Sequence, residues 1–357
     1  MGWYALAEDT SDIGYVGASY ITVFGDNGEV LQTLPYDCGV MVGYEPTVMK
    51  PQPQSLHVSG DGSTLFATTS NQQPDQAPRV MFAWDTETWE PYSDSPGFLY
   101  PAYSGTYGVG ARVSPDGSYV QHISDKYSTI ARQSRVYRLS DWAVMLYCSG
   151  TYGGAFSGDG TRFAVPRYIS EAWYIKVYDT ATWGEVHSYA LADADVVDIC
   201  ITHSGGTVYW VDWGSANLKR ARVGVSEDIT VAIAGSSIDA LCVTADGSRL
   251  AALGSDTVYV YDLVDPNAAS LPLISAISVP DAAYSYRADS FQPVPGSSLI
   301  WVRGAGFVDV VAGTVTPFVF PPEYDVNCIT RFGAVSTPEP DAVFWTNFRN
   351  AREVLSE

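Results

Sequence analysis

The strongest constraint on the fold is a phrase of roughly forty residues that recurs along the chain. It is clearest at 155–191, where apolar stretches alternate with a turn at Ser157-Gly158-Asp159-Gly160 and a second turn after Val177-Tyr178-Asp179. Such a phrase predicts four short strands, which make one blade of a β-propeller. A ring of these blades would use all 357 residues, so we expect an all-β chain with a single β-propeller domain spanning 1–357.

The turn inside each phrase is the best-defined part of the repeat. Its pattern is Ser/Thr-x-Asp-Gly-Ser/Thr between apolar stretches, in which Asp bonds the backbone and Gly adopts positive φ. Clear copies begin at Ser59, Ser114 and Ser157, variants begin at Thr202 and Thr244, and weaker copies lie near Val294 and Thr337. The aspartates of these turns are therefore expected to be structural.

The second half of the phrase also repeats. Third strands end in Trp84-Asp85-Thr86 and Tyr178-Asp179-Thr180, and each is followed by a Thr-Trp turn. These phrases resemble the YVTN-type and WD-repeat-like propellers over about residues 20–345, although the Gly-His dipeptide of true WD repeats is missing. The resemblance implies a propeller with a central channel and loop-lined faces, and it implies no single activity.

Counting strands predicts seven four-stranded blades, with eight as the alternative. Six complete blades run from about Gln54 to Phe320, and the remaining strands come from both ends of the chain. We expect the N- and C-termini to share the last blade, with residues 1–34 closing the ring against 325–357. Sharing a blade in this way removes an exposed sheet edge.

Charge narrows the classes of partner. The formal net charge is −21 and no basic run is present. A phosphate backbone or an anionic membrane would be repelled, whereas cationic protein surfaces and neutral glycans are compatible. No apolar run approaches the roughly 18 residues of a membrane span, and residues 1–20 lack the pattern of a signal peptide. We expect no membrane insertion, and either a cytoplasmic location or display on a virion surface.

Catalytic chemistry has little support in the sequence, which predicts no catalytic residue and no cofactor. Asp193, Asp195 and Asp198 form an acidic cluster that is a candidate calcium site, with a solvated acidic loop as the favoured alternative. Cys200, Cys242 and Cys328 each lie two residues before a Thr. Three thiols that converge on the channel can bind a soft metal, but small buried side chains between blades are the favoured interpretation.

Two long loops, 35–53 and 93–107, hold the candidate binding residues. They are aromatic side chains among Gly, Ser and Pro, namely Tyr36, Tyr44, Phe98, Tyr100 and Tyr103. Tyrosine beside serine and glycine is typical of recognition surfaces, because it combines a large rigid contact area with a hydroxyl. Folding of the loops over the propeller as a lid is an equal alternative.

These features together predict a non-enzymatic binding or assembly module. Its most specific form is a virion protein, either phage-tail or capsid-associated, that contacts other subunits of the particle and glycans of the host surface. An intracellular protein-interaction scaffold and a metal-dependent propeller hydrolase or lactonase are the alternatives. The hydrolase predicts a channel mouth with convergent acids, whereas the module predicts a channel plugged by apolar side chains.

Overall fold

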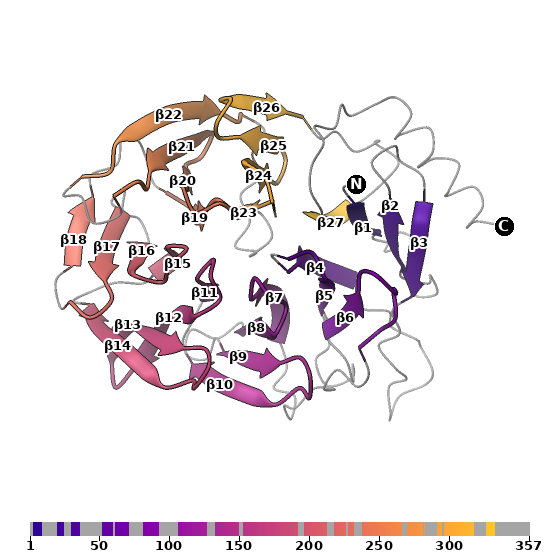
Figure 1. The fold of residues 1–357 in the computed structure, drawn as a ribbon, viewed down its shortest axis with the longest axis horizontal. Helices are drawn as coiled ribbons and strands as arrows, with labels where there is room; N and C mark the ends of the chain where they lie inside the picture. Colours follow the sequence, from indigo (N-terminus) through magenta and orange to yellow (C-terminus); the bar gives the residue numbers. More distant parts are fainter. Residues whose placement is uncertain are drawn as a thin grey trace.

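The computed structural model is a β-propeller, in which small sheets stand around a common axis (Figure 1). The described residues are 3–8, 20–24, 30–35, 52–59, 61–70, 81–92, 106–126, 133–149, 153–191, 196–212, 218–225, 228–231, 238–265, 270–280, 282, 291–294, 296–317 and 326–332. Within these ranges every regular element is a strand, and no helix is long and apolar enough to cross a membrane.

The described strands form seven antiparallel sheets, six of four strands and one of three. The closing blade has the order β27-β1-β2-β3, and each other blade is made of consecutive strands. The strands are β1 (Trp3–Glu8), β2 (Tyr20–Phe24), β3 (Val30–Pro35), β4 (Gln52–Val58), β5 (Thr64–Ser70), β6 (Met81–Asp85), β7 (Thr106–Val113), β8 (Tyr119–Lys126), β9 (Gln133–Arg138), β10 (Val144–Ser149), β11 (Ala155–Phe156), β12 (Arg162–Ile169), β13 (Ala172–Asp179), β14 (Glu185–Leu191), β15 (Val196–Ile201), β16 (Thr207–Asp212), β17 (Leu218–Arg222), β18 (Asp228–Val231), β19 (Ala240–Val243), β20 (Arg249–Leu253), β21 (Thr257–Asp262), β22 (Leu273–Ser278), β23 (Phe291–Pro293), β24 (Leu299–Val302), β25 (Gly306–Asp309), β26 (Thr314–Thr316) and β27 (Val326–Phe332). The first strand of each phrase lies nearest the axis (Figure 1).

The two ends of the chain meet in one blade. Strand β27 pairs with β1, and the register places Trp3 opposite Phe332 and Ala5 opposite Thr330. Strands β2 and β3 complete this sheet outwards. The predicted propeller of four-stranded blades, closed by its termini, is therefore confirmed. The further strand predicted at 341–346 lies outside the described residues.

Inner strands are buried on both faces of the sheet, which explains the incomplete alternation of apolar residues along them. All six residues of β16 are buried. Val208 and Trp210 pack towards the β11–β14 blade, whereas Tyr209 and Val211 pack towards the β19–β22 blade. Trp210 is fully buried, and burying a large apolar side chain contributes roughly 2–3 kcal/mol. Successive blades are thus held together by interdigitated side chains.

The first turn, between the first and second strands, has the predicted chemistry. Ser157 Oγ donates to Asp159 Oδ1 at 2.6 Å, and the Thr161 amide donates to the same oxygen at 3.0 Å. Gly160 has φ of +71°, which a residue with a side chain rarely adopts. The Asp159 amide donates to the His203 carbonyl of the next blade at 2.9 Å. The aspartate therefore holds its own turn, while the backbone connects neighbouring blades.

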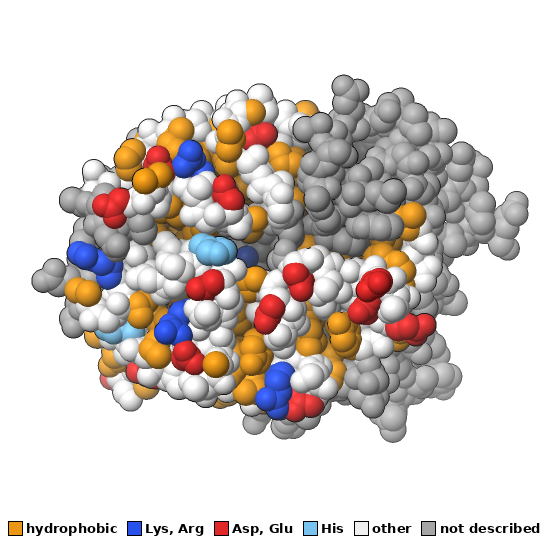
Figure 2. All heavy atoms as spheres, viewed as in Figure 1, with side chains coloured by type: hydrophobic (Ala, Val, Ile, Leu, Met, Phe, Trp, Pro, Cys, Tyr) orange, Lys and Arg blue, Asp and Glu red, His pale blue; other side chains and the backbone are white. Residues whose placement is uncertain are grey.

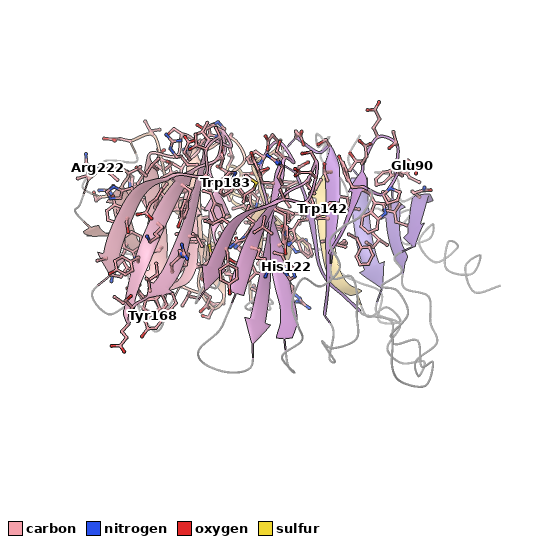
Figure 3. The ribbon with its side chains drawn as sticks, turned by 90° about the horizontal axis from the view of Figure 1, so that it is seen from below. Glu90, His122, Trp142, Tyr168, Trp183 and Arg222 are labelled. Atoms are coloured by element: carbon pink, nitrogen blue, oxygen red, sulfur yellow. The ribbon has the colours of Figure 1, made fainter. Side chains whose placement is uncertain are left out.

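The second turn, between the third and fourth strands, is locked to the first turn. Thr180 Oγ1 donates to the Gly160 carbonyl at 2.6 Å. The next residues bring Trp183 into the left-handed region at φ of 56°, as also occurs for Trp89 and Trp142. Both turns lie on one side of the ring, which we call the turn face. In Figure 3 the labelled Trp142 and Trp183 lie towards this face, and Tyr168 lies at the opposite one.

For Trp183 we predict that replacement by glycine destabilises the protein less than replacement by alanine. Its ring packs edge-on against Tyr119 of the preceding blade, with the centroids 5.0 Å apart. Trp183→Ala should lower the free energy of unfolding by roughly 2–3 kcal/mol, since this contact is lost. Trp183→Gly should be about 1 kcal/mol more stable than the alanine variant, because glycine tolerates positive φ. Urea unfolding of both variants tests the order, and an alanine variant as stable as the glycine variant would contradict it.

Candidate functional site

The structure leaves the predicted loop site untested. Tyr36, Tyr44, Phe98, Tyr100 and Tyr103 all lie outside the described residues. Their role in binding stays a prediction from the sequence. The described part of the chain instead draws attention to two regions, the centre of the ring and the turn face.

One position repeats along the innermost strands, which lie nearest the axis of the ring (Figure 1). The residue two places before the Ser or Thr that opens the first turn, or before Val294 in the weak copy, is polar or small in six blades. Among the described side chains these residues are His57, Arg112, Ala155, Cys200, Cys242 and Gln292. Their chemistry differs from blade to blade, so the repeat does not dictate it.

Arg112 forms an ion pair between blades that are not neighbours. Its Nη2 lies 3.3 Å from Asp198 Oδ1, and the strands that carry them, β7 and β15, are separated by the β11–β14 blade. Asp198 Oδ2 also accepts the Leu241 amide of β19 at 2.8 Å. Burial raises the pKa of Asp198, while Arg112 and the amides of Leu241 and Ile199 act in the opposite direction. Asp198 therefore connects three blades.

His57 forms the second contact of this kind. Its Nδ1 lies 3.2 Å from Gln292 Oε1 of β23, and its Nε2 accepts the Ala111 amide of β7 at 3.4 Å. Burial and the nearby Arg112 charge lower the pKa of His57 to about 3, against the effect of the Gln292 hydrogen bond. The ring is therefore neutral at physiological pH, and it acts as a hydrogen-bonding link among three blades.

The thiols of Cys200 and Cys242, which lie beside this network, are buried and form no disulfide. Cys200 and Cys242 are each 5% exposed and lie on neighbouring inner strands. Burial, and next the Asp198 charge, raises the pKa of Cys200 well above its ordinary value, and the same two causes raise the pKa of Cys242. Both cysteines are therefore uncharged thiols at neutral pH, and uncharged side chains suit the packed space between blades.

The metal sites considered from the sequence fall partly outside the described residues. Asp193, Asp195 and the Cys328 side chain are not described, and Asp198 is engaged by Arg112. Within the described ranges no three His, Cys, Asp or Glu side chains come close enough together to hold a metal ion. Calcium binding by the acidic cluster and soft-metal binding by three thiols stay predictions.

Sequence reasoning missed His57, Arg112 and Gln292. The available signal is the position of Cys200 and Cys242, two residues before the Thr of a first turn, because the same count from the other first turns leads to these three residues. The expected plug of apolar side chains also differs from the paired polar groups found at the centre. Polar side chains fit there because each finds a partner from another blade, which offsets the loss of hydration.

The turn face is acidic. Its exposed carboxylates include Asp61, Asp116, Asp159 and Asp246, one from each of four first turns. Partial burial opposes ionisation of Asp116, but hydrogen bonds from Ser114 and Ser118 outweigh it and lower its pKa. Arg249 on this face is paired with Asp262 at 2.9 Å, and the equivalent Arg162 with Asp179. Figure 2 shows acidic side chains spread over the blades of this face.

Comparison with known proteins supports the fold alone. No protein-family model matches the chain, and no curated protein matches it. A protein of unknown function from Desulfotomaculum acetoxidans is similar at 11% identity, with a TM-score of 0.60 and coverage of 93% of this chain and 99% of that one. The fold is a β-propeller of four-stranded blades.

Two further solved structures agree with this fold. The β-propeller domain of Cps50 (Swd1) from Myceliophteria thermophila has a TM-score of 0.52 at 14% identity, covering 76% of this chain and 87% of that one. A chain of the mitotic checkpoint complex has a TM-score of 0.51 at 10% identity, covering 80% and 81%. At these identities the likeness extends to the architecture and not to a shared activity.

Proposed function

We propose that this protein is a non-enzymatic binding or assembly module built on a YVTN-type, WD-repeat-like propeller. The observation that carries the proposal is that the polar side chains at the centre of the ring bond to one another. Arg112 is engaged by Asp198, and His57 by Gln292 and a backbone amide. These groups serve to connect blades, which leaves the two faces and the outer rim as the surfaces that meet other molecules.

The most specific form of this proposal is a structural or host-recognition protein of a virion. A net charge of −21 with only 17% charged residues implies that uncharged polar residues supply much of the polar surface, which suits contacts with protein subunits and neutral glycans. Among the structures of similar fold, one belongs to the mitotic checkpoint complex, an assembly of several proteins. The alternative, an intracellular scaffold, would contact its protein partners through the same kind of surface.

Native purification with mass spectrometry tests the proposal. We expect the protein to sediment with a particle and to be recovered beside capsid or tail proteins. Recovery with other, non-virion partners would favour the intracellular scaffold. A free monomer that binds no protein, and that hydrolyses ester or lactone substrates when a divalent metal is added, would overturn the binding module in favour of the hydrolase.

A further inference from the structure

The second turns of the blades share one exposed position. It lies two residues after the last residue of the third strand, and in three blades that last residue is an aspartate that accepts the amide of this position. The donors are Glu87 to Asp85 at 2.9 Å, Val264 to Asp262 at 3.0 Å and Val311 to Asp309 at 2.9 Å. These three turns share this hydrogen bond, while the side chains at the position differ in chemistry.

The fold does not require valine at this position. Glu87 occupies it with its side chain exposed, and the turns after β9 and β13 carry the exposed Ser140 and Ala181 there. Val264 is 83% exposed and Val311 is 69% exposed, the two highest values among the exposed large hydrophobic residues of the described chain. Side chains so exposed contribute little to the core, so packing within the propeller does not explain why they are apolar.

The two valines do not stand alone. They lie on neighbouring blades, and the start of β22 adds Leu273 and Ile274, which are 43% and 46% exposed. We call Val264, Leu273, Ile274 and Val311 the valine edge. Figure 2 shows hydrophobic side chains along the outer part of the turn face, over the β19–β22 and β23–β26 blades. Clustered exposed apolar side chains with a polar border mark interaction sites more often than single ones do.

The charges around the valine edge select the kind of partner. Asp265 follows Val264 and is exposed, Asp309 flanks Val311, and the exposed Asp246 lies farther in, in the first turn of the same blade as Val264. Arg249, a cation on this part of the face, is paired with Asp262 at 2.9 Å. A second copy of this chain, with its net charge of −21, would meet repulsion here, and so would nucleic acid. A cationic protein segment would be attracted.

We propose that the valine edge docks a segment of a partner protein that carries apolar side chains beside lysine or arginine. The proposal rests on the assignment of the protein as an interaction module, and it adds the surface and the chemistry of the partner. Apolar contact supplies the core of such an interface, and the surrounding carboxylates supply orientation and a faster encounter.

The test uses a fluorescent twelve-residue peptide of alternating leucine and lysine, whose affinity is measured by anisotropy. The variant Val264→Glu/Val311→Glu copies the residue that Glu87 supplies in another blade, so it should fold. Its matched control is Ser140→Glu/Ala181→Glu, which adds the same charge at equivalent positions elsewhere. We expect at least tenfold weaker binding by the first variant, in spite of its two added negative charges, and equal or tighter binding by the control.

Several results would overturn the proposal. If Val264→Glu/Val311→Glu binds the peptide equally or more tightly, the peptide is attracted by charge alone. The same conclusion follows if the uncharged variant Val264→Thr/Val311→Thr binds the peptide as tightly as the native protein. Concentration-dependent dimerisation in analytical ultracentrifugation, abolished by the glutamate variant, would assign the edge to a second copy. If both double variants recover the same partners from the native source equally well, the protein is still an interaction module, but the valine edge is not its docking surface.

Discussion

Arg112→Met is expected to lower the free energy of unfolding by about 3 kcal/mol, because it leaves the Asp198 carboxylate without its counter-ion at the centre of the ring. Both side chains are mostly buried, at 20% and 15% exposed, which places the effect at the lower end for a broken buried pair. Urea unfolding provides the measurement.

The double variant Arg112→Met/Asp198→Asn distinguishes an ion pair from simple packing. We expect it to recover more than half of the loss, since no unpaired charge then remains, and the double-mutant cycle gives the coupling energy. Arg138→Met is the matched control, because its partner Asp141 lies on the surface, and it should have little effect on stability. Losses that simply add in the double variant would contradict a direct interaction.

Acid should weaken the fold through its buried histidines. The pKa of His57 is lowered to about 3, by burial and then by Arg112, and the pKa of His122 to about 4, by burial and then by Arg135. Each neutral ring therefore contributes stability that is present above the unfolded-state pKa of 6.5 and is lost as the pH falls towards the folded value. The loss is up to roughly 1.4 kcal/mol per pH unit for each histidine.

His57→Gln isolates the contribution of one ring. At pH 7.5 the variant should be less stable than the native protein, because glutamine does not reproduce both hydrogen bonds of the imidazole. The difference should shrink by roughly 2 kcal/mol at pH 4.5, where the native protein has lost most of the His57 contribution. Asp198 acts in the opposite sense, since its raised pKa favours the folded state at lower pH, but it is present in both proteins. A difference that stays constant between the two pH values would show that His57 does not titrate between the folded and unfolded states.

The features that the sequence predicted well are those encoded locally. The first turn is complete within five residues, as Ser157 and Asp159 show, so its pattern is legible in the clear copies. Closure of the ring followed from counting strands, because an unpaired inner edge has to be satisfied by the other end of the chain.

The contacts at the centre could not be predicted in this way. Arg112 and Asp198 are 86 residues apart, and His57 and Gln292 are 235 residues apart. Which of the inner side chains meet depends on the diameter of the closed ring and on the side-chain lengths, neither of which is written in a local pattern. The exposure of Val264 could not be predicted from the local sequence either, since the preceding Leu263 in the same turn is buried.

The pairing of β27 with β1 has a consequence for the order of events during synthesis. Strand β1 is synthesised well before its inner neighbour β27, so the inner edge of β1 stays open until residues 326–332 have emerged. An open edge accepts a strand from any nearby chain. Intermediate blades can form as they are made, but the ring closes only after translation has reached β27. A ribosome that stops earlier releases a chain with a free edge, and such a chain is prone to join its neighbours on the same polysome.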